Sequence, residues 1–271
     1  MEKRSDGPLS VKILVLRAPG TNCDEETARA VRDVGLEAEV VHVSLLIRGR
    51  KRLEDYAGLI IPGGFSYGDR VRAGAILGKL LEAHLGDELR DYVSSGAPVL
   101  GICNGFQALV EAGLLPDSGR FGGVSMALAP NVTARFEARW VRLIVERPEL
   151  CAFTRLVPEG ALLRMPVAHA EGRFIAPPEA LRDLVSRPRT LLRYAKPDGS
   201  PAAGEYPYNP NGSMMDLAGL CNERGNVMGL MPHPERALYS WQLPEGPRND
   251  SRSDGRLIFA SMADYVLERL R

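Results

Sequence analysis

The sequence has no excess of charge of either sign. Its 34 Lys and Arg residues balance its 34 Asp and Glu residues, and no sustained basic stripe runs along the chain. Proteins that bind nucleic acids use clusters of Lys and Arg to neutralise phosphates. We therefore expect no nucleic-acid partner. The short basic segment 48–52 is interpreted as a solvated loop, with a docking role as the alternative.

Long apolar runs are also missing. No segment approaches the roughly 20 apolar residues that span a bilayer, and the charged first ten residues lack the apolar stretch of a signal peptide. We expect no membrane partner and a cytoplasmic location. The length predicts one domain over 11–271, preceded by a polar lead-in at 1–10.

Cysteines are few and widely spaced. The four residues Cys23, Cys103, Cys151 and Cys221 form no CxxC pair, which argues against a zinc ribbon or a dense disulfide framework. Reduced thiols and no metal site are therefore expected, with one thiol as a candidate reactive group. The sequence also contains no GxxxxGK[ST] motif, so it has no phosphate-binding P-loop.

Short apolar runs alternate with helical patterns over most of the chain. The runs lie at 11–16, 37–43, 56–61, 97–102 and 226–231. Helical patterns occupy 25–34 and 256–270, and such alternation predicts parallel βαβ units. From about residue 130 the pattern changes, and 134–145 alternates as in a half-exposed strand. An antiparallel extension of the sheet is expected there, and 241–255 is predicted to be a mobile loop.

Cys103 lies between a buried strand and a helical pattern, flanked by Gly101 and Gly105. This arrangement predicts a nucleophile elbow, a tight turn that presents a side chain at the start of a helix. The N–H groups and dipole of that helix favour a thiolate and so lower the pKa of the thiol, which is about 8.5 in free cysteine. The alternative is a cysteine that merely fills the core.

His233 is the best candidate for a general base. Among the four histidines it alone follows a buried strand and precedes a carboxylate, Glu235, by two positions. On an extended segment these side chains would project on the same side, so Glu235 could orient the imidazole. The alternative is a surface turn with a solvated pair. Cys103, His233 and Glu235 together predict a catalytic triad.

A Gly-Gly loop, Gly63 and Gly64, directly follows the run 56–61. Loops at the carboxyl ends of parallel strands line the site of a doubly wound sheet. The backbone N–H groups of Gly64 and Phe65, with that of Asn104, could stabilise an oxyanion. The alternative is an ordinary tight turn.

These motifs resemble those of the triad (class I) glutamine amidotransferases. The GxCxGxQ pattern is matched by Gly101, Cys103, Gly105 and Gln107, and His-x-Glu by His233 and Glu235. Further motifs are similar to those of the family of glutaminase subunits of phosphoribosylformylglycinamidine synthases. They lie at 22–24, 63–69, 169–174, 209–213, 221–226 and 231–236.

The resemblance implies a flavodoxin-like fold with a doubly wound, mostly parallel α/β sheet. It also implies that the protein hydrolyses glutamine to glutamate and ammonia. Cys103 would attack the amide carbon, His233 would move protons and Glu235 would hold His233. Gly63 and Gln107 would help to hold glutamine. No cofactor is implied in this chain, because ATP and Mg²⁺ would bind a synthetase subunit that uses the ammonia in purine biosynthesis. A small accessory subunit is a further implied partner.

Two segments, 169–174 and 206–214, are candidates for contact with such a partner. The residues concerned are His169, Glu171, Gly172, Asn209 and Asn211. Ordinary turn structure is the alternative for both segments.

Three other functions are considered. The chain could serve another amidotransferase complex, could be a noncatalytic binding or regulatory module on the same fold, or could be a cysteine hydrolase of the same sheet architecture. Motifs outside the triad argue against the first, the intact Cys, His and Glu against the second, and the His-Pro-Glu segment after the last strand against the third.

Overall fold

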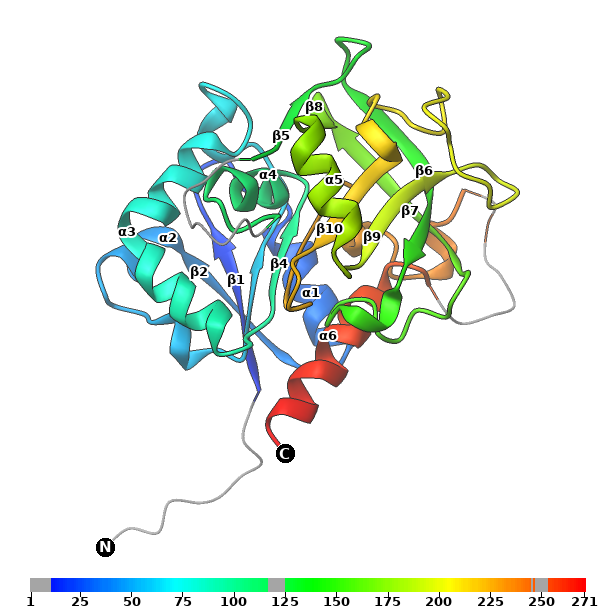
Figure 1. Ribbon diagram of the computed structural model, residues 1–271. Helices are drawn as coiled ribbons and strands as arrows, with labels where there is room; N and C mark the ends of the chain where they lie inside the picture. Colours follow the sequence, from blue (N-terminus) through cyan, green and yellow to red (C-terminus); the bar gives the residue numbers. More distant parts are fainter. Residues whose placement is uncertain (1–10, 117–124, 245, 247–252) are drawn as a thin grey trace, which may run out of the picture.

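The structure, a computed structural model, describes residues 11–116, 125–244, 246 and 253–271. In these ranges nine strands form one sheet in the order β2-β1-β3-β4-β11-β10-β9-β6-β7 (Figure 1). The first five strands in this order pair in parallel, and the remaining pairs are antiparallel. The predicted fold class, a doubly wound and mostly parallel sheet with an antiparallel extension, is confirmed.

The elements have the following bounds. The strands are β1 (Lys12–Arg17), β2 (Glu37–His42), β3 (Gly58–Ile61), β4 (Val99–Ile102), β5 (Ala127–Pro130), β6 (Glu137–Glu146), β7 (Leu162–His169), β8 (Glu171–Ile175), β9 (Leu191–Ala195), β10 (Leu217–Cys221) and β11 (Val227–Leu230). The α-helices are α1 (Asp24–Asp33), α2 (Val43–Ile47), α3 (Ala75–Ser94), α4 (Asn104–Glu111), α5 (Pro178–Ser186) and α6 (Arg256–Arg269). β5 and β8 form a separate antiparallel pair.

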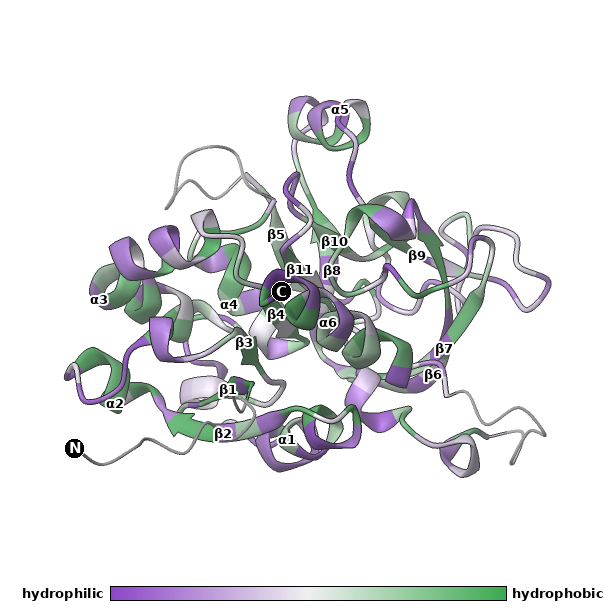
Figure 2. Ribbon diagram, turned by 90° about the horizontal axis from the view of Figure 1, so that it is seen from below, coloured by the Kyte–Doolittle hydropathy of each residue, from purple (hydrophilic) through white to green (hydrophobic). Residues whose placement is uncertain are grey.

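The central strands are apolar on both faces. Every residue of β3, β4 and β11 is buried, as is the middle of β1. Figure 2 shows why: α3 and α4 cover one face of these strands, and α1 and α6 cover the other. A parallel sheet enclosed in this way has strands that are near-continuous hydrophobic runs. The strands and the two helices expected in this part of the chain are thereby confirmed, with ends that differ by up to two residues.

Two glycines allow α4 to begin directly above the sheet. A Cβ atom on Gly105 would lie 1.9 Å from the carbonyl oxygen of Ile61, and one on Gly101 would lie 2.7 Å from the carbonyl carbon of Gly105. Either side chain would push the helix away from β3 and β4. The glycines of the cysteine motif therefore determine how closely Cys103 approaches the neighbouring strand ends.

The antiparallel half is only partly evident from the sequence. The half-exposed strand expected at 134–145 is β6, whose residues alternate in burial. β7, β9 and β10 were not anticipated. β7 contains a proline and the buried Arg164, whose Nε lies 2.7 Å from Oδ2 of Asp254 on a distant segment. A buried charged residue interrupts the apolar pattern by which a strand is recognised in the sequence, and its ion-pair partner is evident only in the structure.

Some expectations concern residues that the structure does not describe. The lead-in at 1–10 lies outside the described ranges, as does part of the predicted loop 241–255. Within that loop Trp241 belongs to a short 3₁₀ helix, Ser240–Gln242. The mobility of the loop and the single domain over 11–271 stay predictions. In the described ranges, no helix is both long and apolar enough to cross a membrane.

Candidate active site

Cys103 occupies the predicted elbow. It connects β4 to α4 with φ 49° and ψ −104°, a positive φ that is uncommon for a residue other than glycine. Its backbone N–H donates to the carbonyl oxygen of Leu230 in β11 (2.8 Å), and its thiol lies 3.7 Å from the carbonyl oxygen of Ala168 in β7. Strained backbone of this kind persists only where the surrounding structure holds it in place, and it is frequent at catalytic sites.

His233 and Glu235 form a buried pair. Nδ1 of His233 lies 2.5 Å from Oε1 of Glu235, and both residues are 2% exposed. The expected pairing is confirmed, but the extended backbone proposed for it is wrong, because Pro234–Arg236 forms a 3₁₀ turn. That turn still brings the carboxylate within hydrogen-bond distance of Nδ1. Among the described residues Nε2 of His233 has no hydrogen-bond partner, so this nitrogen is available for proton transfer.

The surroundings of His233 favour its protonated form. Burial alone would lower the pKa of the imidazole, but the Glu235 carboxylate and the nearby Cys103 side chain raise that pKa well above its usual range. An imidazolium at neutral pH stabilises a neighbouring thiolate. It can also supply a proton to a leaving amine. A protonated His233 can therefore serve as the proton donor of this site.

The Gly-Gly loop only partly matches the expected oxyanion site. The N–H of Phe65 donates to the carbonyl oxygen of Gly20 (2.9 Å), so this amide is occupied in the present conformation. Asn104 begins α4, and the first N–H groups of a helix have no partner within it. Gly64 and Asn104 therefore remain the candidate donors, and their role stays a prediction.

A polar network supports the elbow from the other side. The side-chain Nδ2 of Asn104 donates to Oδ1 of Asp69 (3.2 Å) and to Oε1 of Gln107 (3.0 Å). Nε2 of Gln107 in turn donates to the carbonyl oxygen of Glu171 (2.5 Å). Burial and the nearby Glu171 raise the pKa of Asp69 to about 6. Gln107 thus ties α4 to β8, and its expected contact with glutamine stays a prediction.

Comparison with known proteins agrees with this geometry. Residues 10–266 match the family described as the CobB/CobQ-like glutamine amidotransferase domain. The chain is 42% identical to phosphoribosylformylglycinamidine synthase subunit PurQ of Archaeoglobus fulgidus, covering 96% of this chain and 98% of the relative. PurQ of Methanococcus maripaludis is also 42% identical, over 86% of this chain and 85% of that one.

The chain belongs to the PurQ family of glutamine amidotransferases. Among solved structures it resembles a chain of PurLQS from Thermotoga maritima, with a TM-score of 0.72 and 33% identity over 95% of this chain and all of that one. The site therefore combines the sequence of a PurQ subunit with a cysteine at the β4–α4 turn and a buried His233–Glu235 pair.

The residues expected at a partner interface of this PurQ chain are largely interior. His169, Asn209 and Asn211 are each 3% exposed or less. Nδ1 of His169 lies 3.2 Å from Oδ1 of Asn131, and Asn211 donates to the carbonyl oxygen of Gly172 (2.8 Å). Burial lowers the pKa of His169 to about 3, so its ring is neutral. These buried side chains form hydrogen bonds that hold the loops together. Their contact with a partner stays a prediction.

Cys23 is a residue at the site that sequence reasoning noted only as part of a motif. Its sulfur and the donor atoms of His233 and Glu235 all lie within 4.8 Å of one another. Nη2 of Arg236 donates to the sulfur (3.2 Å). That positive charge opposes a cation at this point, so we assign no metal to the three ligands. The signal in the sequence was a second cysteine in the loop between β1 and α1, because loops that follow the carboxyl ends of parallel strands line the sites of such sheets.

The two thiols of the site should differ in reactivity. Burial raises the pKa of the Cys23 thiol to about 11, so roughly one molecule in a thousand carries this thiolate at pH 8. We expect iodoacetamide at pH 8 to label Cys103 at least about tenfold faster than Cys23. Mass spectrometry of peptides after timed quenching measures both rates in one sample, and equal rates would contradict the assignment of Cys103 as the nucleophile.

Proposed function

We propose that this chain hydrolyses L-glutamine to glutamate and ammonia as the glutaminase subunit of a phosphoribosylformylglycinamidine synthase. The observation that carries the proposal is the strained Cys103 turn together with the buried His233–Glu235 pair. The Cys103 thiolate would attack the side-chain amide carbon of glutamine. The carbon–nitrogen bond would then break as His233 gives its proton to the leaving ammonia, which leaves a thioester on Cys103.

The second half of the reaction reverses the proton transfer. Neutral His233 would take a proton from water, and the resulting hydroxide would attack the thioester to release glutamate and the Cys103 thiol. Glu235 would keep Nδ1 protonated, so that Nε2 faces the reaction. The backbone N–H groups of Gly64 and Asn104 would stabilise the oxyanion in both steps.

We propose that the ammonia passes to a synthetase subunit in the cytoplasm, which would bind ATP and Mg²⁺ and convert formylglycinamide ribonucleotide to the amidine. The similarity to a chain of the PurLQS structure supports such an assembly and a small accessory subunit. Several exposed apolar side chains are candidate contacts for the synthetase. They lie on loops that follow strand ends, or on or beside the loops considered above as partner contacts. They are Phe65, Val71, Val132, Phe136, Tyr206 and Met214.

Isotope transfer tests both parts of the proposal. The chain is mixed with the synthetase, ATP, formylglycinamide ribonucleotide and glutamine labelled with ¹⁵N at the amide, in the presence of unlabelled ammonium. We expect amidine that retains most of the label and one glutamate per amidine, because ammonia would not mix with the solvent. Product that carries mainly unlabelled nitrogen would contradict direct transfer, and absence of glutamate would contradict the glutaminase activity.

A further inference from the structure

Two cysteines outside the active site lie in contact. Cys151 follows the 3₁₀ turn Pro148–Leu150, and Cys221 is the last residue of β10. Their sulfur atoms are 2.8 Å apart, and both residues are at most 2% exposed. They are about 70 positions apart in the sequence, so only the fold brings them together. Neither belongs to the catalytic triad.

The segments that carry the two cysteines are already packed closely. The N–H of Ala152 donates to the carbonyl oxygen of Gly225 (2.7 Å), in the turn that joins β10 to β11. A Cβ atom on Gly225 would lie 1.9 Å from the carbonyl oxygen of Leu150. The Cys151 sulfur is also 3.7 Å from Sδ of Met228 in β11. A bond between the cysteines would therefore join segments that already lie in contact.

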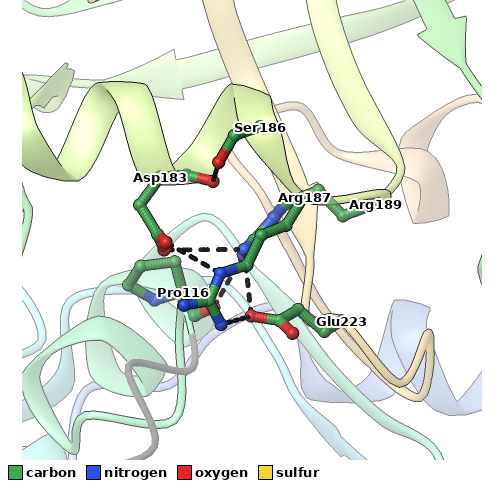
Figure 3. A network of polar contacts seen from close by, with 6 residues as sticks. All are labelled: Pro116, Asp183, Ser186, Arg187, Arg189 and Glu223. Atoms are coloured by element: carbon green, nitrogen blue, oxygen red, sulfur yellow. Dashed lines mark hydrogen bonds and ion pairs between the residues drawn. The ribbon is translucent and has the colours of Figure 1, made fainter.

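The backbone of Cys221 is held from the opposite side. Its N–H donates to the carbonyl oxygen of Thr190 (3.0 Å). Figure 3 shows Arg187 and Arg189 converging on Glu223, two residues beyond Cys221, with Asp183 of α5 beside them. The Arg189 guanidinium also donates to the carbonyl oxygen of Pro116 (2.9 Å). The Cys221 side chain itself faces Cys151, with the two sulfur atoms 2.8 Å apart.

We propose that Cys151 and Cys221 form a disulfide bond, which makes this pair an oxidation site separate from the triad. The oxidant is a low-molecular-weight disulfide such as glutathione disulfide. One cysteine thiolate attacks it, forming a mixed disulfide and releasing one glutathione thiolate. The second cysteine thiolate attacks the protein sulfur of the mixed disulfide and releases the other glutathione. Two protein thiols and one glutathione disulfide thus become one protein disulfide and two glutathione thiols.

Burial decides when this reaction can occur. In the folded protein, burial raises the pKa of the Cys221 thiol well above its ordinary value, and small oxidants cannot reach either sulfur. The bond therefore forms while the chain folds, and the folded protein then protects it from reductants. It closes a loop of about 70 residues, which restricts the unfolded chain and stabilises the hairpin whose strand β11 leads to His233.

Thiol counting tests the bond itself. The full chain is refolded in a glutathione redox buffer, denatured with excess alkylating agent and analysed by peptide mass spectrometry. We expect two alkylated cysteines, Cys23 and Cys103, and one linked peptide pair that contains Cys151 and Cys221. Four alkylated cysteines, or a linked pair that includes Cys23 or Cys103, would overturn the proposal.

Thermal unfolding tests the stabilising role. Wild-type chain refolded with a reductant present should have an unfolding midpoint about 5–10 °C below that of wild-type chain refolded in the glutathione redox buffer. The Cys151→Ala/Cys221→Ala double variant should show no dependence on reductant, whereas Cys103→Ala should show the full wild-type shift. Because the oxidised and reduced midpoints are compared for the same sequence, packing changes at the substituted sites do not contribute to the measured shift. Equal midpoints for oxidised and reduced wild type would overturn this role.

Discussion

Replacing Cys103 by alanine is expected to lower glutamine-dependent turnover by roughly 10⁴-fold or more, because the second thiol at the site, Cys23, has its pKa raised to about 11 by burial and is rarely a thiolate. Alanine keeps the Cβ atom, so the turn between β4 and α4 should be preserved. The measurement is glutamate release by the complex of the variant with the synthetase.

A second nitrogen source separates chemistry from folding. With ammonium in place of glutamine, the Cys103→Ala complex should form the amidine at the wild-type rate, since ammonia bypasses this subunit's chemistry. Cys151→Ala is the matched control, because it also removes a buried thiol but should keep glutaminase activity within about threefold. Loss of both glutamine- and ammonia-dependent product would identify Cys103 as a structural cysteine.

Glu235→Gln should reduce kcat by about 10²–10⁴-fold with little change in protein stability. The glutamine side chain has nearly the same shape, but it does not balance the charge of an imidazolium. Once the carboxylate is gone, burial lowers the pKa of His233 with less opposition. Proton transfer to the leaving ammonia weakens as a result, and the pH below which His233 is charged shifts downward.

The pH dependence of kcat distinguishes this effect from simple misfolding. The alkaline limb, where loss of the His233 proton reduces turnover, should move to lower pH in Glu235→Gln. Glu26→Gln is the control, because Glu26 pairs with the neighbouring Arg236 (2.8 Å) without touching the imidazole. It should retain the wild-type profile. A Glu235→Gln variant within tenfold of wild type would show that Glu235 does not orient the base.

The local patterns around the triad were informative because they have local causes. A buried run followed by Gly101, Cys103 and Gly105 predicts a strand, a tight turn and a helix, and the structure contains all three. The His-x-Glu spacing predicted the ring–carboxylate pair correctly although the backbone between them is a 3₁₀ turn. Side chains two residues apart can meet in an extended segment and also in a 3₁₀ turn. The predicted pairing was therefore correct although the predicted backbone conformation was not.

Predictions that depended on neighbours were less reliable. The sequence could not reveal that Gly20 accepts the Phe65 N–H, because the loop containing Gly20 lies about 45 positions away. Nor could it reveal that Asn209 and Asn211 turn inward, since polar residues in a turn-rich segment are usually exposed. Each outcome depends on which distant backbone groups need hydrogen-bond partners.

The sequence by itself determined the buried parallel strands, the cysteine elbow and the histidine–carboxylate pair, because apolar periodicity, glycine sterics and two-residue spacing act over a few residues. Only the tertiary structure decided that β11 lies beside β4, which brings His233 to a thiol 130 positions earlier in the chain. It also decided that Cys23 joins that site and that Cys151 meets Cys221. Strand order and long-range contacts follow from the packing of the whole core, which no local pattern encodes.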